Sequence, residues 1–190
     1  APRQLETQQE NESDDNSSDP LAKSRIARDG LKQGTPAPNF TLPLIADGEL
    51  SLEQYRGQKV LLVFSAPDCG PCNVLAPELQ KLSRRTPDIQ VIMVSRGDRE
   101  TNLIKAREHD LTFPIVLQRQ WEISRRYAMF ATPIAYLIDE QGIIASDVAM
   151  GPGAIINLLV GSAILSLLDA RRVSDESEMN EAAIEVPQSV

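Results

Sequence analysis

The stretch "VLLVFSAPDCGPCNVLAPELQKL", from Val60 to Leu82, decides how the rest of the chain is interpreted. With Lys59 it opens on "KVLLVFS", a continuous β-branched and aromatic run that is typical of a strand buried on both faces. After the Cys-Gly-Pro-Cys tetrapeptide, apolar residues recur at helical spacing: Val74, Leu75, Leu79 and Leu82. The tetrapeptide therefore lies where a buried strand ends and a helix, predicted over about 71–84, begins.

This junction gives the first cysteine a chemical reason to be reactive. The first-turn amides of a helix have no internal partners, and the helix dipole adds partial positive charge there. Both stabilise a thiolate, which is the nucleophilic form of cysteine. Cys72 follows Cys69 by about one helical turn, so that it can attack the Cys69 sulfur and release a bound client. Pro71 suits a first helical turn, and Gly70 lets a partner chain approach closely.

Two other interpretations of the cysteine pair are open at this point. The chain has two cysteines and one histidine, His109, whereas a tetrahedral zinc site needs four ligands. A metal would therefore require a half-site shared between chains, and we expect no metal. A purely structural disulfide across so short a loop would stabilise the fold little. We expect a redox couple that works without a cofactor, with Cys69 exposed and attacking and Cys72 buried and resolving.

Composition limits both the partners and the folded part of the chain. The 190 residues carry a formal net charge of −8 and no basic run, which argues against nucleic acid. Residues 1–33 are predicted to form a disordered acidic linker with a short helix over 21–30, because they hold few apolar groups. Residues 34–170 form the predicted domain, and residues 171–190 form a predicted acidic, flexible tail.

Within the domain, strand and helix patterns alternate. A hairpin is expected over 37–52, around the turn "IADG", and further strands over 89–95, 113–118, 133–139 and 142–150. Helical patterns lie between them, over 98–110 and 120–129. The single tryptophan, Trp121, is in the second of these and is expected in the core. This order predicts an α/β fold with a mixed central sheet flanked by helices on both faces. We expect the apolar segment 151–168 to be a helix buried against the domain. Membrane contact is the alternative, although the segment is shorter than the roughly 20 residues that a span needs.

A second feature supports the redox interpretation. Thr132-Pro133 stands directly before a predicted strand, where proline is tolerated and a cis bond is common. Together with Cys69-Gly70-Pro71-Cys72 after a buried strand, this resembles the thioredoxin superfamily over residues 34–170. The resemblance implies a thioredoxin-like fold with a cis proline that faces the dithiol. It also implies that Thr132 pairs with the backbone of the substrate.

The opening "GTPAPNFTLPLIADGELSLEQYRGQKVLLVFSAPDCGPC" resembles the redoxin group more narrowly. This group includes TlpA-like and ResA-like reductases and the methylamine-dehydrogenase accessory protein. Its members share the N-terminal hairpin and have an extra strand-helix insertion between the dithiol and the proline. In this chain the segment between Cys72 and Pro133 is long enough to hold that insertion. "VSRGDRETNLIKAREHDLTFPIVLQ" is similar to redoxin domains that follow a membrane-embedded redox module. The resemblance implies an extracytoplasmic protein, tethered through a removed N-terminal segment, that exchanges electrons with protein thiols or disulfides and with an upstream redox donor or acceptor.

The chain departs from the family at the residues around the dithiol. The buried aspartate of minimal thioredoxins is matched by Val63, and the glutamate of the cytochrome-maturation reductases by Leu75. Glu78 is a candidate substitute for the missing proton acceptor of the resolving cysteine. Asp68 precedes Cys69, where its charge opposes the thiolate but where it could also cap the helix.

Three functions remain in competition at this stage. The leading one is a thiol–disulfide oxidoreductase that acts on protein cysteines and serves cell redox homeostasis. A peroxiredoxin-like antioxidant peroxidase is second, although Ala66 stands where that family needs a hydroxyl and Leu62 where it needs a proline. The third is a non-catalytic docking or assembly factor on the same scaffold. The sequence does not fix the direction of electron flow, because tens of millivolts decide it.

Overall fold

The computed structural model describes residues 29–184, with side chains from 29 to 174. The helix predicted over 21–30 and most of the predicted acidic linker therefore lie outside the described residues. The described part contains a five-stranded sheet in the order β5-β4-β3-β6-β7. Its strands are β3 (Lys59–Ser65), β4 (Ile89–Ser95), β5 (Ile115–Leu117), β6 (Ile134–Ile138) and β7 (Ala149–Met150). β3, β4 and β5 run parallel, whereas β6 and β7 pair antiparallel, so the mixed sheet is confirmed.

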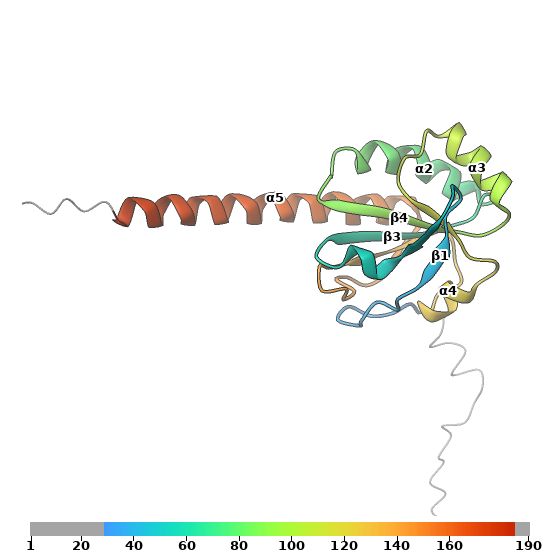
Figure 1. The fold of residues 1–190 in the computed structure, drawn as a ribbon, viewed down its shortest axis with the longest axis horizontal. Coiled ribbons are helices and arrows are strands. Elements are labelled where there is room, and N and C mark those ends of the chain that lie inside the picture. Colours follow the sequence, from blue (N-terminus) through green and yellow to red (C-terminus); the bar gives the residue numbers. More distant parts are fainter. Residues whose placement is uncertain (1–28, 185–190) are drawn as a thin grey trace, which may run out of the picture.

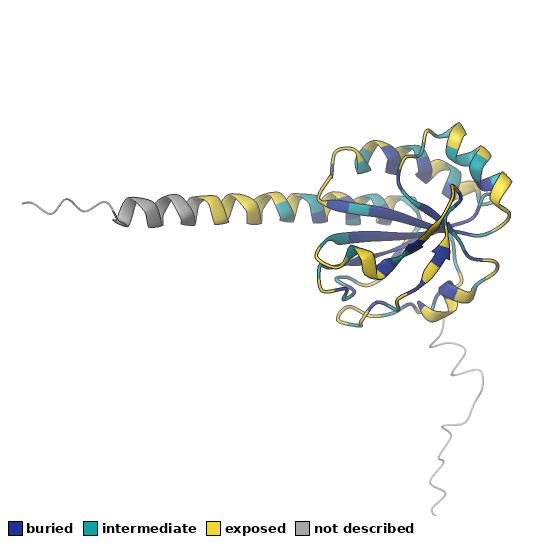
Figure 2. Cartoon of the chain, in the orientation of Figure 1, coloured by how far each residue is buried: buried dark blue, intermediate teal, exposed yellow. Residues whose placement is uncertain are grey.

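Strand β3 is the centre of the sheet, and its side chains alternate between two apolar cores. Leu62 and Phe64 point into the core that the N-terminal hairpin and α4 (Glu122–Arg126) cover. Leu61 and Val63 point into the core that α2 (Gly70–Ser83) and α5 (Gly151–Ile184) cover. Figure 1 shows α4 on the opposite side of the sheet from α2 and α3 (Arg99–Glu108). Burial on both faces explains why every β3 residue after Lys59 is buried (Figure 2).

The predicted N-terminal hairpin is also present. β1 (Thr41–Pro43) pairs antiparallel with β2 (Glu49–Ser51), and the chain then enters the 3₁₀ helix η1 (Leu52–Tyr55). The Leu44 N–H donates to the Gly48 carbonyl across the turn, and Gly48 has a positive φ of 95° that glycine adopts without strain. Leu42 and Leu50 face each other across the hairpin and close one side of the core.

Two buried tyrosines connect the N-terminal segment to the sheet. The Tyr136 hydroxyl donates to the Tyr127 carbonyl at 2.7 Å and accepts from the Leu31 N–H at 3.1 Å. The Tyr127 hydroxyl donates to the Pro38 carbonyl at 2.9 Å. Burial raises the pKa of Tyr136 to about 12, and burial also raises the pKa of Tyr127 well above its usual range. Both side chains therefore remain neutral hydrogen-bond donors at physiological pH.

The predicted elements differ from the structure at some of their ends and faces. Val74 was expected on the apolar face of α2, but it points outward and is 66% exposed, because Leu75 and Leu79 occupy the core face. The strand predicted over 142–150 shortens to β7. Before β7 the chain forms only isolated bridges, Pro36 with Ile143 and Ile138 with Ile144.

Helix α5 combines a buried start with an exposed continuation. Ile155 and Leu159 are buried against α2 and the sheet, so the prediction of a buried terminal helix is confirmed for these turns. Further along, the prediction is wrong, because Ile164 and Leu165 are 51% and 62% exposed. The helix continues past the domain there (Figure 1). It reaches Ile184, so the backbone over 171–184 is helical where the sequence predicted a flexible tail. Within residues 29–184, the part Gly151–Ser174 is long and apolar enough to cross a membrane.

Candidate active site

The dithiol loop is shaped by the end of β3 and the start of α2. The chain leaves β3 at Ser65, and the Cys69 N–H donates to the Ala66 carbonyl in the short connection. Cys69 is the N-cap of α2, and its sulfur accepts the N–H of Cys72 at 3.2 Å. Pro71 lies in the first turn, where its missing N–H leaves no partner unsatisfied. The sulfur of Cys69 is thus held at a helix N-terminus, as the sequence predicts.

The two cysteines are joined as a disulfide with an S–S distance of 2.12 Å and a Cα–Cα distance of 5.2 Å. Cys72 is 3% exposed, whereas Cys69 is partly exposed. Cys69 is thus the more exposed of the two cysteines and Cys72 the buried one, as the sequence predicts. A Cβ added to Gly70 would meet no atom within 4 Å, so the surface beside Cys69 is open to an approaching chain.

The proline loop lies against this disulfide. The Thr132-Pro133 bond is cis, and the Thr132 carbonyl oxygen is 3.6 Å from the Cys69 sulfur. Pro133 is buried, and its carbonyl accepts the N–H of Gly151 at 2.9 Å, which ties the loop to the start of α5. The structure therefore brings together the two sequence motifs that lie about sixty residues apart, 69–72 and 132–133.

The structure revises the expectation for Asp68. The cap position of α2 belongs to Cys69, so Asp68 is the residue before the cap and not the cap itself. Its exposed side chain lines a hollow of about 350 Å³ together with Arg96 and Asp98. Hydrogen bonds from the backbone and side chain of Thr101 lower the pKa of Asp98. This hollow therefore presents charged groups of both signs beside the dithiol loop.

Arg96, which lines this hollow, stacks on an aromatic pair that was not predicted. The guanidinium of Arg96 lies 3.8 Å above the Trp121 ring, and Trp121 packs edge-on against Phe130 at 5.8 Å. Trp121 was expected in the core, but it is only partly buried and lies outside both apolar cores. Phe130 is 39% exposed two residues before Thr132, and the alternation of apolar and polar residues gives no signal for this cluster.

The three positions considered from the sequence for a proton acceptor of Cys72, namely 63, 75 and 78, do not provide one. Val63 and Leu75 are buried apolar side chains of the core. Glu78 lies on the exposed face of α2, where its carboxylate is 2.7 Å from the ammonium of Lys81. Cys72 also lines a cavity on another side. Lys105 of α3 and His109, the residue directly after α3, line the same cavity.

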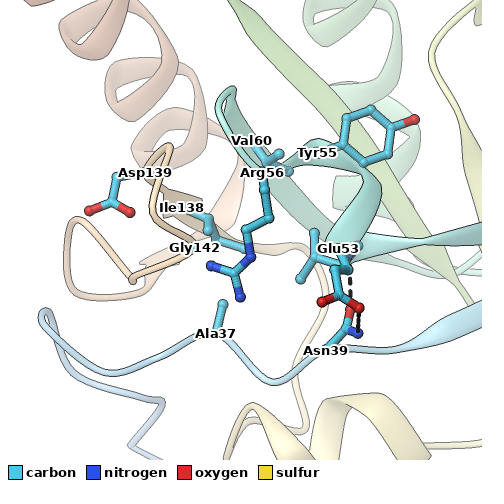
Figure 3. A pocket seen from close by; sticks show the side chains of 10 residues that line it. Ala37, Asn39, Glu53, Tyr55, Arg56, Val60, Ile138, Asp139 and Gly142 are labelled. Atoms are coloured by element: carbon cyan, nitrogen blue, oxygen red, sulfur yellow. Dashed lines mark hydrogen bonds between the residues drawn. The ribbon is translucent and has the colours of Figure 1, made fainter.

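A separate hollow lies at the opposite end of β3 from the dithiol (Figure 3). It is lined by Val60 at the start of β3 and by Arg56, whose guanidinium donates to the Gln141 carbonyl. Asn39 and Glu53 are joined there by two hydrogen bonds of 3.0 and 3.3 Å. With a volume of about 10 Å³, this hollow has no room for an organic ligand. The hydrogen bonds there instead hold Asn39, in the segment before β1, against Glu53 of η1.

A thioredoxin-like sheet with a vicinal cysteine pair at a helix N-terminus, facing a cis proline, defines a thiol–disulfide oxidoreductase. The chain belongs to the AhpC/TSA family, whose sequence profile matches residues 33–146.

Similar proteins agree with this class. The thioredoxin-like protein YneN of Bacillus subtilis is 33% identical over 127 residues, which cover 64% of this chain and 74% of that protein. The thiol-disulfide oxidoreductase ResA of Geobacillus thermodenitrificans is 33% identical over 112 residues, 57% of this chain and 64% of ResA, just under two thirds of its length. The crystal structure of StoA from Bacillus subtilis has a TM-score of 0.55 at 25% identity, covering 66% of this chain and 96% of StoA. The thioredoxin domain of a thiol-disulfide oxidoreductase from Bacteroides vulgatus shares the fold, with a TM-score of 0.63 at 22% identity over 70% of this chain and 99% of that domain.

Proposed function

We propose that this chain exchanges disulfides with cysteines of other proteins, with Cys69 as the attacking residue and Cys72 as the resolving residue. The observation that carries the proposal is the asymmetry of the pair. The Cys69 sulfur is partly exposed and accepts a helix amide, while Cys72 is covered one turn behind it. Only the outer sulfur can meet a protein-sized client, and only the inner one is protected from it.

The exchange proceeds in two steps that conserve atoms and electrons. In the reducing direction, the Cys69 thiolate attacks one sulfur of a client disulfide, and the other client sulfur leaves as a thiolate. Cys72 then loses its proton and attacks the Cys69 sulfur, so that the mixed disulfide breaks and the second client thiol is released. The client disulfide is reduced to two thiols, and the Cys69–Cys72 disulfide is formed. The same steps in reverse oxidise a client dithiol.

We assign client binding to the surface beside Cys69. Thr132 supplies backbone groups next to the sulfur, because its carbonyl is 3.6 Å away. Gly70 and Pro71 leave the approach from the helix side free of bulky groups, since a Cβ at Gly70 meets nothing within 4 Å. Asp68 adds a negative charge at the rim, and Pro133 holds the loop against α5. A client strand that lies across Thr132 would place its disulfide over Cys69.

We place this activity outside the cytoplasm, beside a membrane redox module that supplies or accepts the electrons. Protein disulfides persist in oxidising compartments and are rare in the cytosol, so extracytoplasmic clients are the ones that need such an exchange. The apolar part of α5 beyond Leu159 is consistent with work near a membrane. The domain boundaries 34–170, with flanking acidic segments, remain a prediction.

The test combines turnover with trapping. The wild-type protein, supplied with a dithiol donor, is expected to reduce the disulfides of insulin, and Cys69→Ser should abolish this activity. Cys72→Ser should accumulate a covalent adduct with a client protein that a reductant releases, because the resolving sulfur is missing. The matched control, Cys69→Ser, keeps the buried cysteine and should trap nothing. A wild-type protein without disulfide exchange in either direction, or equal trapping by both variants, would refute the proposal.

A further inference from the structure

A small cavity lies on the inner side of the resolving cysteine. Cys72 lines it from α2, Met93 from β4, and Asn102, Lys105 and His109 from α3 and its end. Its volume is about 20 Å³, and about 10–15 Å³ suffices for one water molecule. The cavity therefore connects the covered sulfur with polar groups on and just after α3, which begins 27 residues after Cys72 in the sequence.

The cavity occupies the neighbourhood of the missing family acid. Val63, which matches the buried aspartate of minimal thioredoxins, pairs in register with Met93, and Met93 lines the cavity. Both side chains belong to the core that α2 covers. The chain has thus replaced the acid on β3 by an apolar residue and brings polar groups to the same side of the sheet from α3.

Two titratable side chains line this cavity together with Cys72. Among the residues that line it, only Lys105 and His109 can gain or lose a proton besides Cys72 itself. They are four residues apart and therefore lie on one side of the helix. The ammonium of Lys105 is 3.2 Å from the carboxylate of Glu108. An ammonium donates hydrogen bonds and accepts none, so Lys105 contributes positive charge to the cavity but no acceptor.

His109 can provide a proton acceptor, the Nε2 atom of its imidazole ring. Its Nε2 atom is buried and has no hydrogen-bond partner among the described residues. A buried polar nitrogen without a hydrogen-bond partner destabilises the fold unless water binds it. Such an atom therefore calls for an explanation, and a catalytic role is one. The segment that carries it is held in place, because the buried Gln80 of α2 forms two hydrogen bonds with Thr112, at 2.8 and 2.9 Å.

We infer that His109 accepts the proton of Cys72, directly or across one water molecule, when Cys72 attacks the mixed disulfide on Cys69. The inference rests on the proposed function. The Cys72 S–H bond breaks, its proton moves to Nε2, the Cys72–Cys69 bond forms, and the client sulfur leaves as a thiolate. Imidazole is the side chain whose protonation ordinarily changes between pH 5 and 8, so it suits a reversible transfer near neutrality. Lys105 stabilises the Cys72 thiolate by its charge.

The two chemical steps can be separated with 4,4′-dithiodipyridine as the disulfide. Attack by Cys69 releases a first thiopyridone, and resolution by Cys72 releases the second, so stopped-flow absorbance resolves two phases. In His109→Gln we expect the second phase to slow about 10-fold or more near neutral pH, and the first phase to change less than about twofold. The pH profile of the second phase should lose its rise through the neutral range.

The control is Arg107→Gln, on the same helix but exposed and outside the cavity, which should leave both phases unchanged. Equal second phases in wild type and His109→Gln would overturn the inference while leaving the proposed function intact. A second phase that depends on Lys105, through Lys105→Gln, but not on His109 would overturn it as well. A wild-type protein with no fast first phase would instead refute the proposed function.

A second measurement needs no substitution at His109. Because the chain has a single histidine, its imidazole proton signals in an NMR spectrum are unambiguous. We expect these signals to differ between the disulfide and dithiol forms of the wild type at one fixed pH, because reduction gives Cys72 an S–H group in the cavity that His109 also lines. Identical signals in the two forms would show that the ring does not sense Cys72, and would overturn the inference even if His109→Gln failed to fold.

Discussion

Replacing Cys72 with serine leaves Cys69 as the only thiol of the chain, so that its ionisation can be followed alone. The amide that donates to the Cys69 sulfur at 3.2 Å belongs to the backbone and survives the substitution. A hydrogen bond to a charged group contributes about 1.5–3 kcal/mol, and a helix N-terminus contributes about 0.3–1 kcal/mol. Even the lower ends, together about 2 kcal/mol, raise the ionisation constant about 30-fold. We therefore expect the pKa of the Cys69 thiol to lie below that of a free cysteine.

The rate of reaction with a small disulfide should reveal this through its dependence on pH. At about pH 6 the thiolate fraction rises about 30-fold, while the weaker basicity of the sulfur lowers its nucleophilicity about 5-fold. The net gain is about sixfold. At about pH 9 an ordinary thiol is already mostly ionised, so only the loss of nucleophilicity remains, and Cys69 should react about three to four times more slowly. The two pH ranges thus predict effects of opposite sign.

The reference thiol should come from the same helix. Val74 is 66% exposed on α2, one turn further from the helix start. A Val74→Cys substitution in a Cys69→Ser/Cys72→Ser background therefore provides an exposed thiol without the N-terminal amide. Absorbance of thiopyridone released from 4,4′-dithiodipyridine measures both proteins between about pH 5 and 10. A rate ratio that stays constant over this range, with no crossover, would refute the role assigned to the helix amides.

Three further predictions concern the scaffold. Leu79 is 0% exposed between α2 and the sheet, so Leu79→Ala should lower the free energy of unfolding by about 2–5 kcal/mol in urea titrations, whereas Val74→Ala on the same helix should change it by less than about 0.5 kcal/mol. Tyr136→Phe removes the partner of the Leu31 N–H and of the Tyr127 carbonyl and should cost about 1–3 kcal/mol by the same measurement; a negligible change would show that the hydroxyl is dispensable. Because burial raises the pKa of Tyr136 to about 12, the unfolded chain loses this proton first, and the stability present below about pH 10 should fall as the pH rises from about 10 to 12. Urea titrations at about pH 8 and 11 should show a smaller decline in Tyr136→Phe than in the wild type.

The sequence predicted those parts of the fold whose pattern is local. β3 and β4 match their predicted bounds, 59–65 and 89–95, because both strands are buried on both faces and read as continuous apolar runs. The proximity of 69–72 to Thr132 and Pro133 is not a local pattern. It could be predicted because the family resemblance spans both motifs, and in the structure the Thr132 carbonyl lies 3.6 Å from the Cys69 sulfur. Trp121 was misplaced because an aromatic residue near a short helix gives no sign of whether it faces the core or, as here, stacks beneath Arg96.

The cavity beside Cys72 was beyond the reach of sequence patterns. His109 stands in a polar stretch, and nothing in its neighbours indicates that its ring turns inward. Its position depends on where the chain runs after α3, and the two hydrogen bonds between Gln80 of α2 and Thr112 hold that segment. The helix α5 is a comparable case. The apolar pattern of its first turns predicted a buried helix. Its continuation beyond residue 170 was not predicted, although residues 171–184 contain no Pro or Gly that would end a helix.

The course of α5 determines which way the reactive surface points when the far end of the helix is fixed. The helix starts beside the proline loop, where Gly151 donates to Pro133, and it passes Lys59 at the other end of β3, where the ammonium donates to Ser166. Its eighteen further residues to Ile184 extend roughly 27 Å more at about 1.5 Å per residue. A dye, bead or lipid anchor placed there would sit on the reverse side of the molecule, so immobilisation by this handle would leave Cys69 facing the solution.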